Sequence, residues 1–126
     1  MTTVTASVLV IEDHAELNDH IAAALRARVP GLVTLGARSL AAAQTTLRTR
    51  RVTAIWSDLG LPDAQGLATL QAVRAAAAGA PVLVFSGSLD LAAAVEAQGV
   101  PFFAKPAQFD QACEHLARLA RDAGRA

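Results

Sequence analysis

The sequence lacks several features that would place it outside the ordinary globular class. It has one cysteine, Cys113, so no internal disulfide can form and a reducing compartment is expected. No apolar run is long enough to cross a membrane, and the first residues, MTTVTAS, lack the basic and apolar parts of a secretory signal. Lys plus Arg and Asp plus Glu number 11 each, so no basic excess favours nucleic acid. A cytoplasmic domain without direct nucleic-acid or membrane partners is the expectation.

Apolar residues, in contrast, are abundant and patterned. They make up 53% of the 126 residues, which is enough for one domain with a buried core and too many for a disordered chain. No linker, internal repeat or low-complexity tract interrupts the pattern. A single domain over residues 1–126 is therefore predicted.

Short apolar runs alternate with helical patterns along the whole length. Continuous, β-branched runs predict five strands, at 7–11, 32–37, 52–57, 81–87 and 100–104. Apolar residues at helical spacing predict five helices, at 14–29, 40–51, 66–78, 89–99 and from 109 onward. This alternation implies an α/β, doubly wound fold, in which helices cover both faces of a five-stranded parallel sheet.

Polar side chains stand where the predicted strands end. Glu12 and Asp13 follow the first strand and Asp58 follows the third, while Ser86 and Lys105 mark the ends of the fourth and fifth. Ligands of an open parallel sheet bind beyond the carboxyl ends of its strands. Three carboxylates gathered there repel one another unless a cation lies between them, and oxygen ligands of this kind suit Mg²⁺.

Each of these residues also has a simpler interpretation. The acidic pair could stabilise the start of a helix, and Asp58 could begin a turn. Ser86 could belong to an ordinary loop, and Lys105 could be solvated. Their coincidence at the ends of four different strands favours the functional interpretation.

Four short motifs occur in order along the chain: VLVIEDH, DLGLPDAQGL, PVLVFSGS and PFFAKP. Together they resemble the receiver domains of two-component response regulators, over essentially the whole chain. The resemblance implies a single-domain, CheY-like receiver with the flavodoxin-like strand order 2-1-3-4-5.

The resemblance also implies a phosphoacceptor and a metal site. Asp58 would accept a phosphoryl group from a phosphohistidine on a histidine kinase or a histidine phosphotransfer protein. An aspartate suits this role because its carboxylate is ionised at neutral pH and needs no general base. Mg²⁺ would be held by Asp13, Asp58, the backbone carbonyl of Gly60 and, through water, Glu12.

Three further residues have implied roles in stabilising and transmitting the phosphorylated state. Lys105 and the Ser86 hydroxyl would each contact a phosphoryl oxygen. Ser86 would move inward on phosphorylation, and Phe102 would rotate into the space that Ser86 leaves. Phe103 is expected to be a core residue. The bond between Lys105 and Pro106 resembles one that is cis in the family.

The sequence departs from the family pattern in three places. The interval from Ser86 to Lys105 is short, which predicts a short or displaced fourth helix. Gly60 and Ser88 are small residues at positions that tune phosphoryl lifetime in the family. Glu12 stands where many members have Asp.

Other functions stay open beside the phosphoacceptor. The chain could be a degenerate receiver that acts only as a binding module, or a receiver from a hybrid kinase or a larger regulator. An aspartyl-phosphate phosphatase would need a second Asp where Gly60 stands, so no enzyme activity is expected. The cognate kinase is not identified by the sequence, and the downstream target is expected to be an unknown protein.

A few residues outside the motifs have simple expected roles. His14 is predicted to be a solvent-exposed residue in the first turn of a helix, although it could touch the site. Trp56 is predicted to pack beneath a helix, and Cys113 to be buried and inert. The arginines of the RTRR segment, residues 48–51, are predicted to be solvated.

Overall fold

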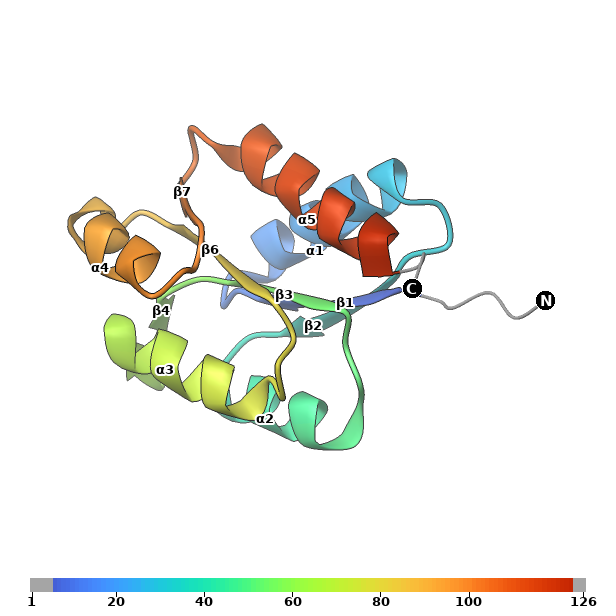
Figure 1. Cartoon of the computed structure of the whole chain (residues 1–126). Helices are drawn as coiled ribbons and strands as arrows, with labels where there is room; N and C mark the ends of the chain where they lie inside the picture. The colour runs from blue at the N-terminus through green and yellow to red at the C-terminus, as the bar shows by residue number, and fades with distance from the viewer. Residues whose placement is uncertain (1–5, 124–126) are drawn as a thin grey trace.

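Strands and helices alternate along residues 6–123, the part of the chain that the computed structural model describes (Figure 1). The strands of the main sheet are β1 (Ser7–Ile11), β2 (Val33–Ala37), β3 (Ala54–Ser57), β6 (Val82–Ser86) and β7 (Phe102–Ala104). The helices are α1 (Ala15–Arg28), α2 (Leu40–Thr49), α3 (Leu67–Ala76), α4 (Ala92–Ala97) and α5 (Phe109–Ala123), with a 3₁₀ turn, η1 (Leu89–Leu91), before α4. Residues 1–5 and 124–126 of the predicted domain lie outside the described part.

The five main strands form one parallel sheet in the order β2-β1-β3-β6-β7. This is the order 2-1-3-4-5 of the five predicted strands, so the predicted fold class is confirmed. The register aligns the strand ends, because Ile11 at the end of β1 pairs with Ser57 at the end of β3. Ser86 pairs with Ala104 in the same way at the ends of β6 and β7. Residues just beyond paired strand ends are therefore neighbours at one edge of the sheet.

The sheet separates two apolar layers, which explains why its strands are continuous apolar runs. Val8 and Val10 of β1 face the layer beneath α1 and α5, and Leu9 and Ile11 face the layer beneath α2 and α3. Figure 1 shows these two helix pairs on opposite sides of the sheet. Trp56 is buried against Phe85 and against Phe109 of α5.

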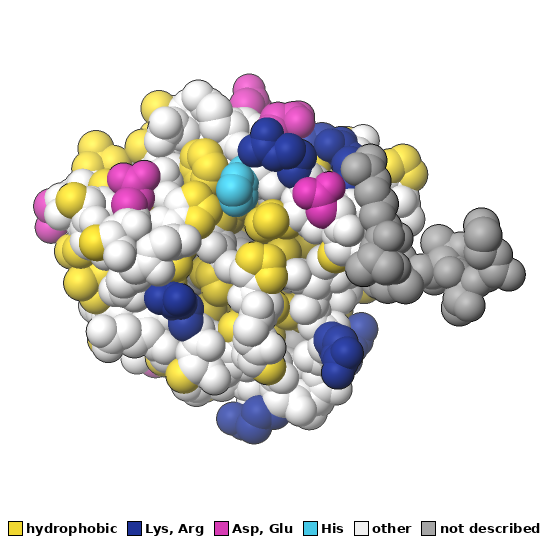
Figure 2. Space-filling model, viewed as in Figure 1, with side chains coloured by type: hydrophobic (Ala, Val, Ile, Leu, Met, Phe, Trp, Pro, Cys, Tyr) yellow, Lys and Arg dark blue, Asp and Glu magenta, His cyan; other side chains and the backbone are white. Residues whose placement is uncertain are grey.

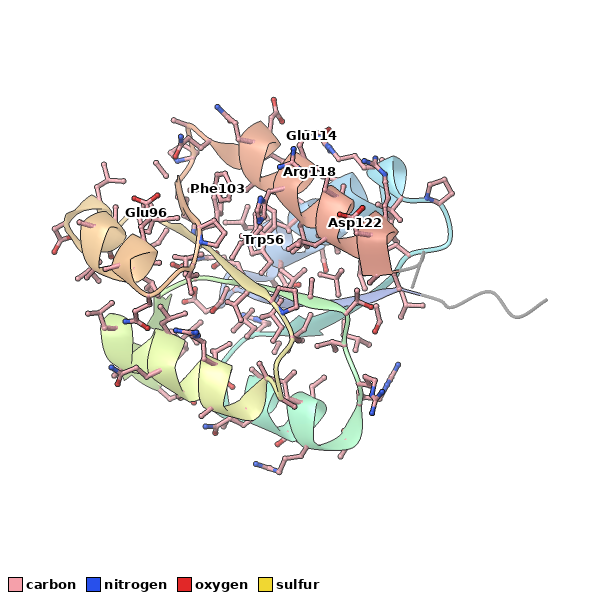
Figure 3. All side chains as sticks on the ribbon, in the orientation of Figure 1. Trp56, Glu96, Phe103, Glu114, Arg118 and Asp122 are labelled. Atoms are coloured by element: carbon pink, nitrogen blue, oxygen red, sulfur yellow. The ribbon has the colours of Figure 1, made fainter. Side chains whose placement is uncertain are left out.

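Two predictions about buried side chains are confirmed in the layer beneath α5. Trp56 packs under a helix, and it lies between the sheet and α5 in Figure 3. Cys113 is fully buried on the inner face of α5, and this burial raises the pKa of its thiol to about 11. A thiol with that pKa remains protonated at neutral pH and is a poor nucleophile.

The predicted elements are present, but several of their ends were placed wrongly. Four of the five main strands begin later than predicted, and three of these are preceded by a residue, Leu32, Val52 or Val100, that is buried yet lies before the hydrogen-bonded ladder. Their apolar character reflects burial and not strand pairing. Helix α2 ends at Thr49 and not at residue 51, because Arg50 adopts an extended conformation. The fourth helix is short, as predicted, with six α-helical residues after the 3₁₀ turn.

The start of α2 is held by two side chains. Ser39 is the N-cap, and its hydroxyl accepts a hydrogen bond from the Ala42 amide. Both carboxylate oxygens of Asp63 accept hydrogen bonds from the amides of Ala41 and Leu40, and these bonds lower the pKa of Asp63. The loop after β3 is thereby tied to the first turn of α2.

That loop also contains a short antiparallel hairpin that was not predicted, formed by β4 (Gly60–Leu61) and β5 (Ala64–Gln65). Its turn includes Pro62 and Asp63. None of the helices in residues 6–123 combines the length and apolar character needed to span a membrane. Acidic and basic side chains both occur on the face that Figure 2 shows, as the balanced charge predicts.

Candidate functional site

Two buried carboxylates lie side by side where β1 and β3 end. Because Ile11 pairs with Ser57, the residues after them, Glu12 and Asp58, are neighbours, and the Asp58 amide donates a hydrogen bond of 3.0 Å to the Ile11 carbonyl. Glu12 is 1% exposed and Asp58 is 9% exposed. Carboxylates this deeply buried require a cation or several hydrogen-bond donors to remain charged.

Lys105 supplies that cation from the far end of the sheet. Its Nζ lies 2.6 Å from Oε1 of Glu12 and 3.0 Å from Oδ2 of Asp58, so one ammonium group joins both carboxylates. Burial alone would lower the pKa of Lys105, but the hydrogen bonds and charges of the two carboxylates outweigh this effect and raise it. Lys105 is the only lysine in the chain.

The position of Lys105 results from the ladder between β6 and β7. Its amide donates a hydrogen bond of 3.0 Å to the Ser86 carbonyl, which continues the pairing of these strands by one residue. The side chain then extends across the end of β6, and Nζ lies 5.9 Å from the centre of the Phe85 ring. The peptide bond from Lys105 to Pro106 is cis, as the family resemblance implied.

The backbone after Asp58 is also fixed in place. Oδ1 of Asp58 accepts a hydrogen bond of 2.7 Å from the Leu59 amide and a longer one of 3.4 Å from the Gly60 amide. The Leu59 carbonyl accepts hydrogen bonds from the Gly66 amide and from the Thr69 hydroxyl. The two oxygens of Asp58 therefore face different partners, with backbone amides on one side and the ammonium of Lys105 on the other.

The acidic pair forms a small cluster with the next residue. A carboxylate oxygen of Glu12, a carboxylate oxygen of Asp13 and a ring nitrogen of His14 all lie within 4.8 Å of one another. His14 is solvent-exposed, as predicted, with 73% of its side chain accessible. It also touches the site, which the sequence had left open, because its Nδ1 lies 3.1 Å from Glu12 and 3.3 Å from Asp13.

The donor set at this edge fits a hydrated Mg²⁺. Asp13 is partly exposed, with 31% of its side chain accessible, so its carboxylate can reach an ion that keeps some of its water. Gly60 lies two residues after Asp58, at the start of β4, and is half-buried. Asp58 is not part of the cluster of Glu12, Asp13 and His14, since Lys105 and the backbone amides engage its two oxygens.

Ser86 and Phe102 lie on neighbouring strands beside these carboxylates. Ser86 is buried, and its hydroxyl oxygen accepts a hydrogen bond of 3.1 Å from the Ser88 amide. Phe102 is half-buried against the apolar layer beneath α2 and α3. Phe103 points to the opposite layer, where its ring lies 5.6 Å from that of His115 (Figure 3).

Two supporting residues were not found from the sequence. Thr69 is fully buried in α3 and holds the Leu59 carbonyl, and Gln108 accepts a hydrogen bond of 2.7 Å from the Ala104 amide at the end of β7. For Thr69 a signal existed, since a polar residue on the buried face of a predicted helix needs a partner. Gln108 comes after a turn and carries no such signal.

The match to a family model decides the classification. The response regulator receiver domain model matches residues 8–117, which include every residue of the site. The chain belongs to the response regulator receiver family. The family resemblance read from four motifs is thereby confirmed.

Solved receiver structures share this fold. The receiver domain of the Francisella response regulator 1452 is 20% identical, with a TM-score of 0.79 over 94% of this chain and 99% of that one. The receiver of a DNA-binding response regulator from Colwellia psychrerythraea is 24% identical, with a TM-score of 0.80 over 92% and 98%. The chemotaxis response regulator CheY4 of Vibrio cholerae is 21% identical, with a TM-score of 0.75 over 92% and 99%. A search of curated protein sequences finds no significant match.

Proposed function

We propose that this receiver accepts a phosphoryl group on Asp58 from a phosphohistidine of a kinase or phosphotransfer protein, in a Mg²⁺-dependent reaction. The transfer would switch its contacts with a downstream protein in the cytoplasm, and the domain would act as an acceptor and not as an enzyme with a separate substrate. The observation that carries the proposal is the single ammonium of Lys105 joined to both Glu12 and Asp58 at the strand ends.

The chemistry assigned to the residues rests on their positions. A carboxylate oxygen of Asp58 forms a bond to phosphorus while the bond from phosphorus to the donor imidazole breaks, and the imidazole leaves with that electron pair. Lys105 stands 3.0 Å from Oδ2 of Asp58, where it can stabilise negative charge on the incoming phosphoryl oxygens. A bound Mg²⁺ would supply further neutralisation of that charge.

The same residues can transmit the change. Ser86 ends the strand between Asp58 and Lys105, so its buried hydroxyl can turn toward a phosphoryl oxygen. Phe102 is only partly buried, and it can rotate into space that Ser86 leaves. Contacts at the surface of β7 would then depend on phosphorylation.

Mg²⁺ binding is expected to depend more on Asp13 than on Glu12. Asp13 is partly exposed and able to coordinate directly, whereas Glu12 is buried and already bonded to Lys105. Asp13→Asn is therefore expected to weaken Mg²⁺ binding by about tenfold or more, and Glu12→Gln by less. Titration followed by the fluorescence of Trp56, two residues before Asp58, measures both. Equal affinity of the wild type and the Asp13 variant would exclude Asp13 as a ligand.

Transfer of the phosphoryl group from a protein donor is expected to require a docking surface, whereas transfer from a small donor such as acetyl phosphate does not require one. The docking surface that we propose includes Leu17 of α1, Pro106 and Ala107; Pro106 and Ala107 are exposed, and Leu17 is half-buried. Leu17→Glu is expected to slow transfer from a phosphorylated histidine phosphotransfer protein by about tenfold, because it places a charge in a desolvated contact. Labelling by acetyl phosphate should stay unchanged.

The matched control for this experiment is Leu89→Glu. Leu89 is exposed and lies on η1, away from α1, so the same change there should leave both donors equally effective. If Leu17→Glu slowed labelling by acetyl phosphate to the same extent, the defect would lie in folding or chemistry and the docking role of Leu17 would be wrong.

A further inference from the structure

The ring of His14, the N-cap residue of α1, lies close to both residues of the acidic pair. Its Nδ1 is 3.1 Å from Oε2 of Glu12 and 3.3 Å from Oδ1 of Asp13. Neighbouring ligand atoms that share one ion at bond lengths of about 2.1 Å lie about 3 Å apart. The 3.3 Å between the His14 nitrogen and the Asp13 oxygen therefore matches adjacent ligand positions around a single metal ion.

The backbone that carries the three side chains is held by hydrogen bonds at every carbonyl. The amide group of Asn18 donates to the Glu12 carbonyl at 3.1 Å, and the Asn18 backbone amide donates to the His14 carbonyl at 2.9 Å. The guanidinium of Arg38 donates to the Asp13 carbonyl at 2.9 Å. The cluster is thus assembled before any ion arrives, which reduces the ordering that binding requires.

Lys105 does not compete for the atoms of this cluster. It engages Oε1 of Glu12, whereas the ring of His14 contacts Oε2 of the same carboxylate. The ring of His14 is largely exposed, so an ion can reach the cluster directly from solvent. The ammonium of Lys105 and a metal ion can therefore bind to opposite sides of Glu12.

We propose that His14 is a further ligand of the cation site, and that it shifts the preference of the site from Mg²⁺ toward transition-metal ions such as Co²⁺. The inference deepens the proposed function, because it concerns the same cation site. The chemical reason is that Mg²⁺ prefers oxygen ligands, whereas an imidazole nitrogen favours later first-row ions. An all-oxygen site at this position would lack that preference.

The test compares the dissociation constants of Mg²⁺ and Co²⁺ for the wild type, His14→Ala and His14→Gln, measured by calorimetry. We expect both His14 variants to weaken Co²⁺ binding by about tenfold or more, with a much smaller effect on Mg²⁺. The visible absorption of bound Co²⁺ should also change when the nitrogen ligand is lost. His20→Ala is the matched control, because His20 is exposed on α1, the helix that His14 precedes, but stacks on Phe109. It should leave both constants unchanged.

The outcomes separate this inference from the proposed function. If Mg²⁺ binds and the His14 variants leave the ratio of the two constants unchanged, the ligand role of His14 is wrong while the receiver chemistry stands. An equal loss of affinity for both ions would also overturn it, since His14 would then only position Glu12. If neither ion binds to the wild type, the proposal fails together with the Mg²⁺ site on which it rests.

Discussion

Lys105→Met is expected to destabilise the fold by about 3 kcal/mol, the lower end of the range for breaking a buried ion pair. The substitution keeps the length of the side chain but removes the ammonium that joins Glu12 and Asp58. Glu12 is 1% exposed, so its carboxylate would remain buried without a cation. We expect the lower end of this energy range because the side chain of Lys105 is 22% exposed, so water reaches one side of its ion pairs. Denaturant unfolding followed by Trp56 fluorescence measures the change.

A second ion pair in the chain provides the control. Arg28 of α1 contacts Glu114 and Asp110 of α5, and both of these carboxylates are exposed. Its pKa is raised mainly by the hydrogen bond to Glu114. Exposed ion pairs contribute little to stability, so Arg28→Met is expected to lower the free energy of unfolding by no more than about 1 kcal/mol.

The cost of losing Lys105 should depend on the charge of Glu12. In a Glu12→Gln background, the side chain left beside the substituted Lys105 is a neutral amide and not a buried carboxylate. Lys105→Met should therefore destabilise the fold less in that background than in the wild type. Lys105→Met could instead destabilise the fold no more than Arg28→Met does, or by the same amount in the Glu12→Gln background. The ion pairs of Lys105 with Glu12 and Asp58 would then be no stronger than a surface ion pair. The buried carboxylates would then be stabilised by other means.

The sequence predicted the site residues because each carries a local signal at a strand end. Glu12, Asp58, Ser86 and Lys105 interrupt apolar runs, and parallel topology alone brings the ends of such runs to one edge. The structure does place Lys105 against Glu12 and Asp58, although β7 and β1 are far apart in the sequence. The roles of these residues in phosphoryl transfer stay predictions.

Other contacts depended on how elements meet in space, and no local pattern encodes them. Asp63 has the sequence context of a turn residue, yet its partners are amides of α2, 22 and 23 residues earlier in the chain. His14 comes after the acidic pair as an ordinary first-turn residue, and only the direction of its ring brings it to Glu12 and Asp13. Such contacts require the packed structure, because exposed polar residues have many possible partners of similar energy.

The central claim is that Asp58 is the phosphoacceptor, and the intact mass of the protein after incubation with acetyl phosphate and Mg²⁺ tests it most directly. The wild type is expected to gain one phosphoryl group, and Asp58→Asn is expected to gain none, because an amide cannot replace the carboxylate nucleophile. Asp63→Asn is the matched control, since Asp63 lies on the same loop but its oxygens bond to α2. It should gain the group as the wild type does. A wild type of unchanged mass, or a phosphoryl group retained in Asp58→Asn, would contradict the claim.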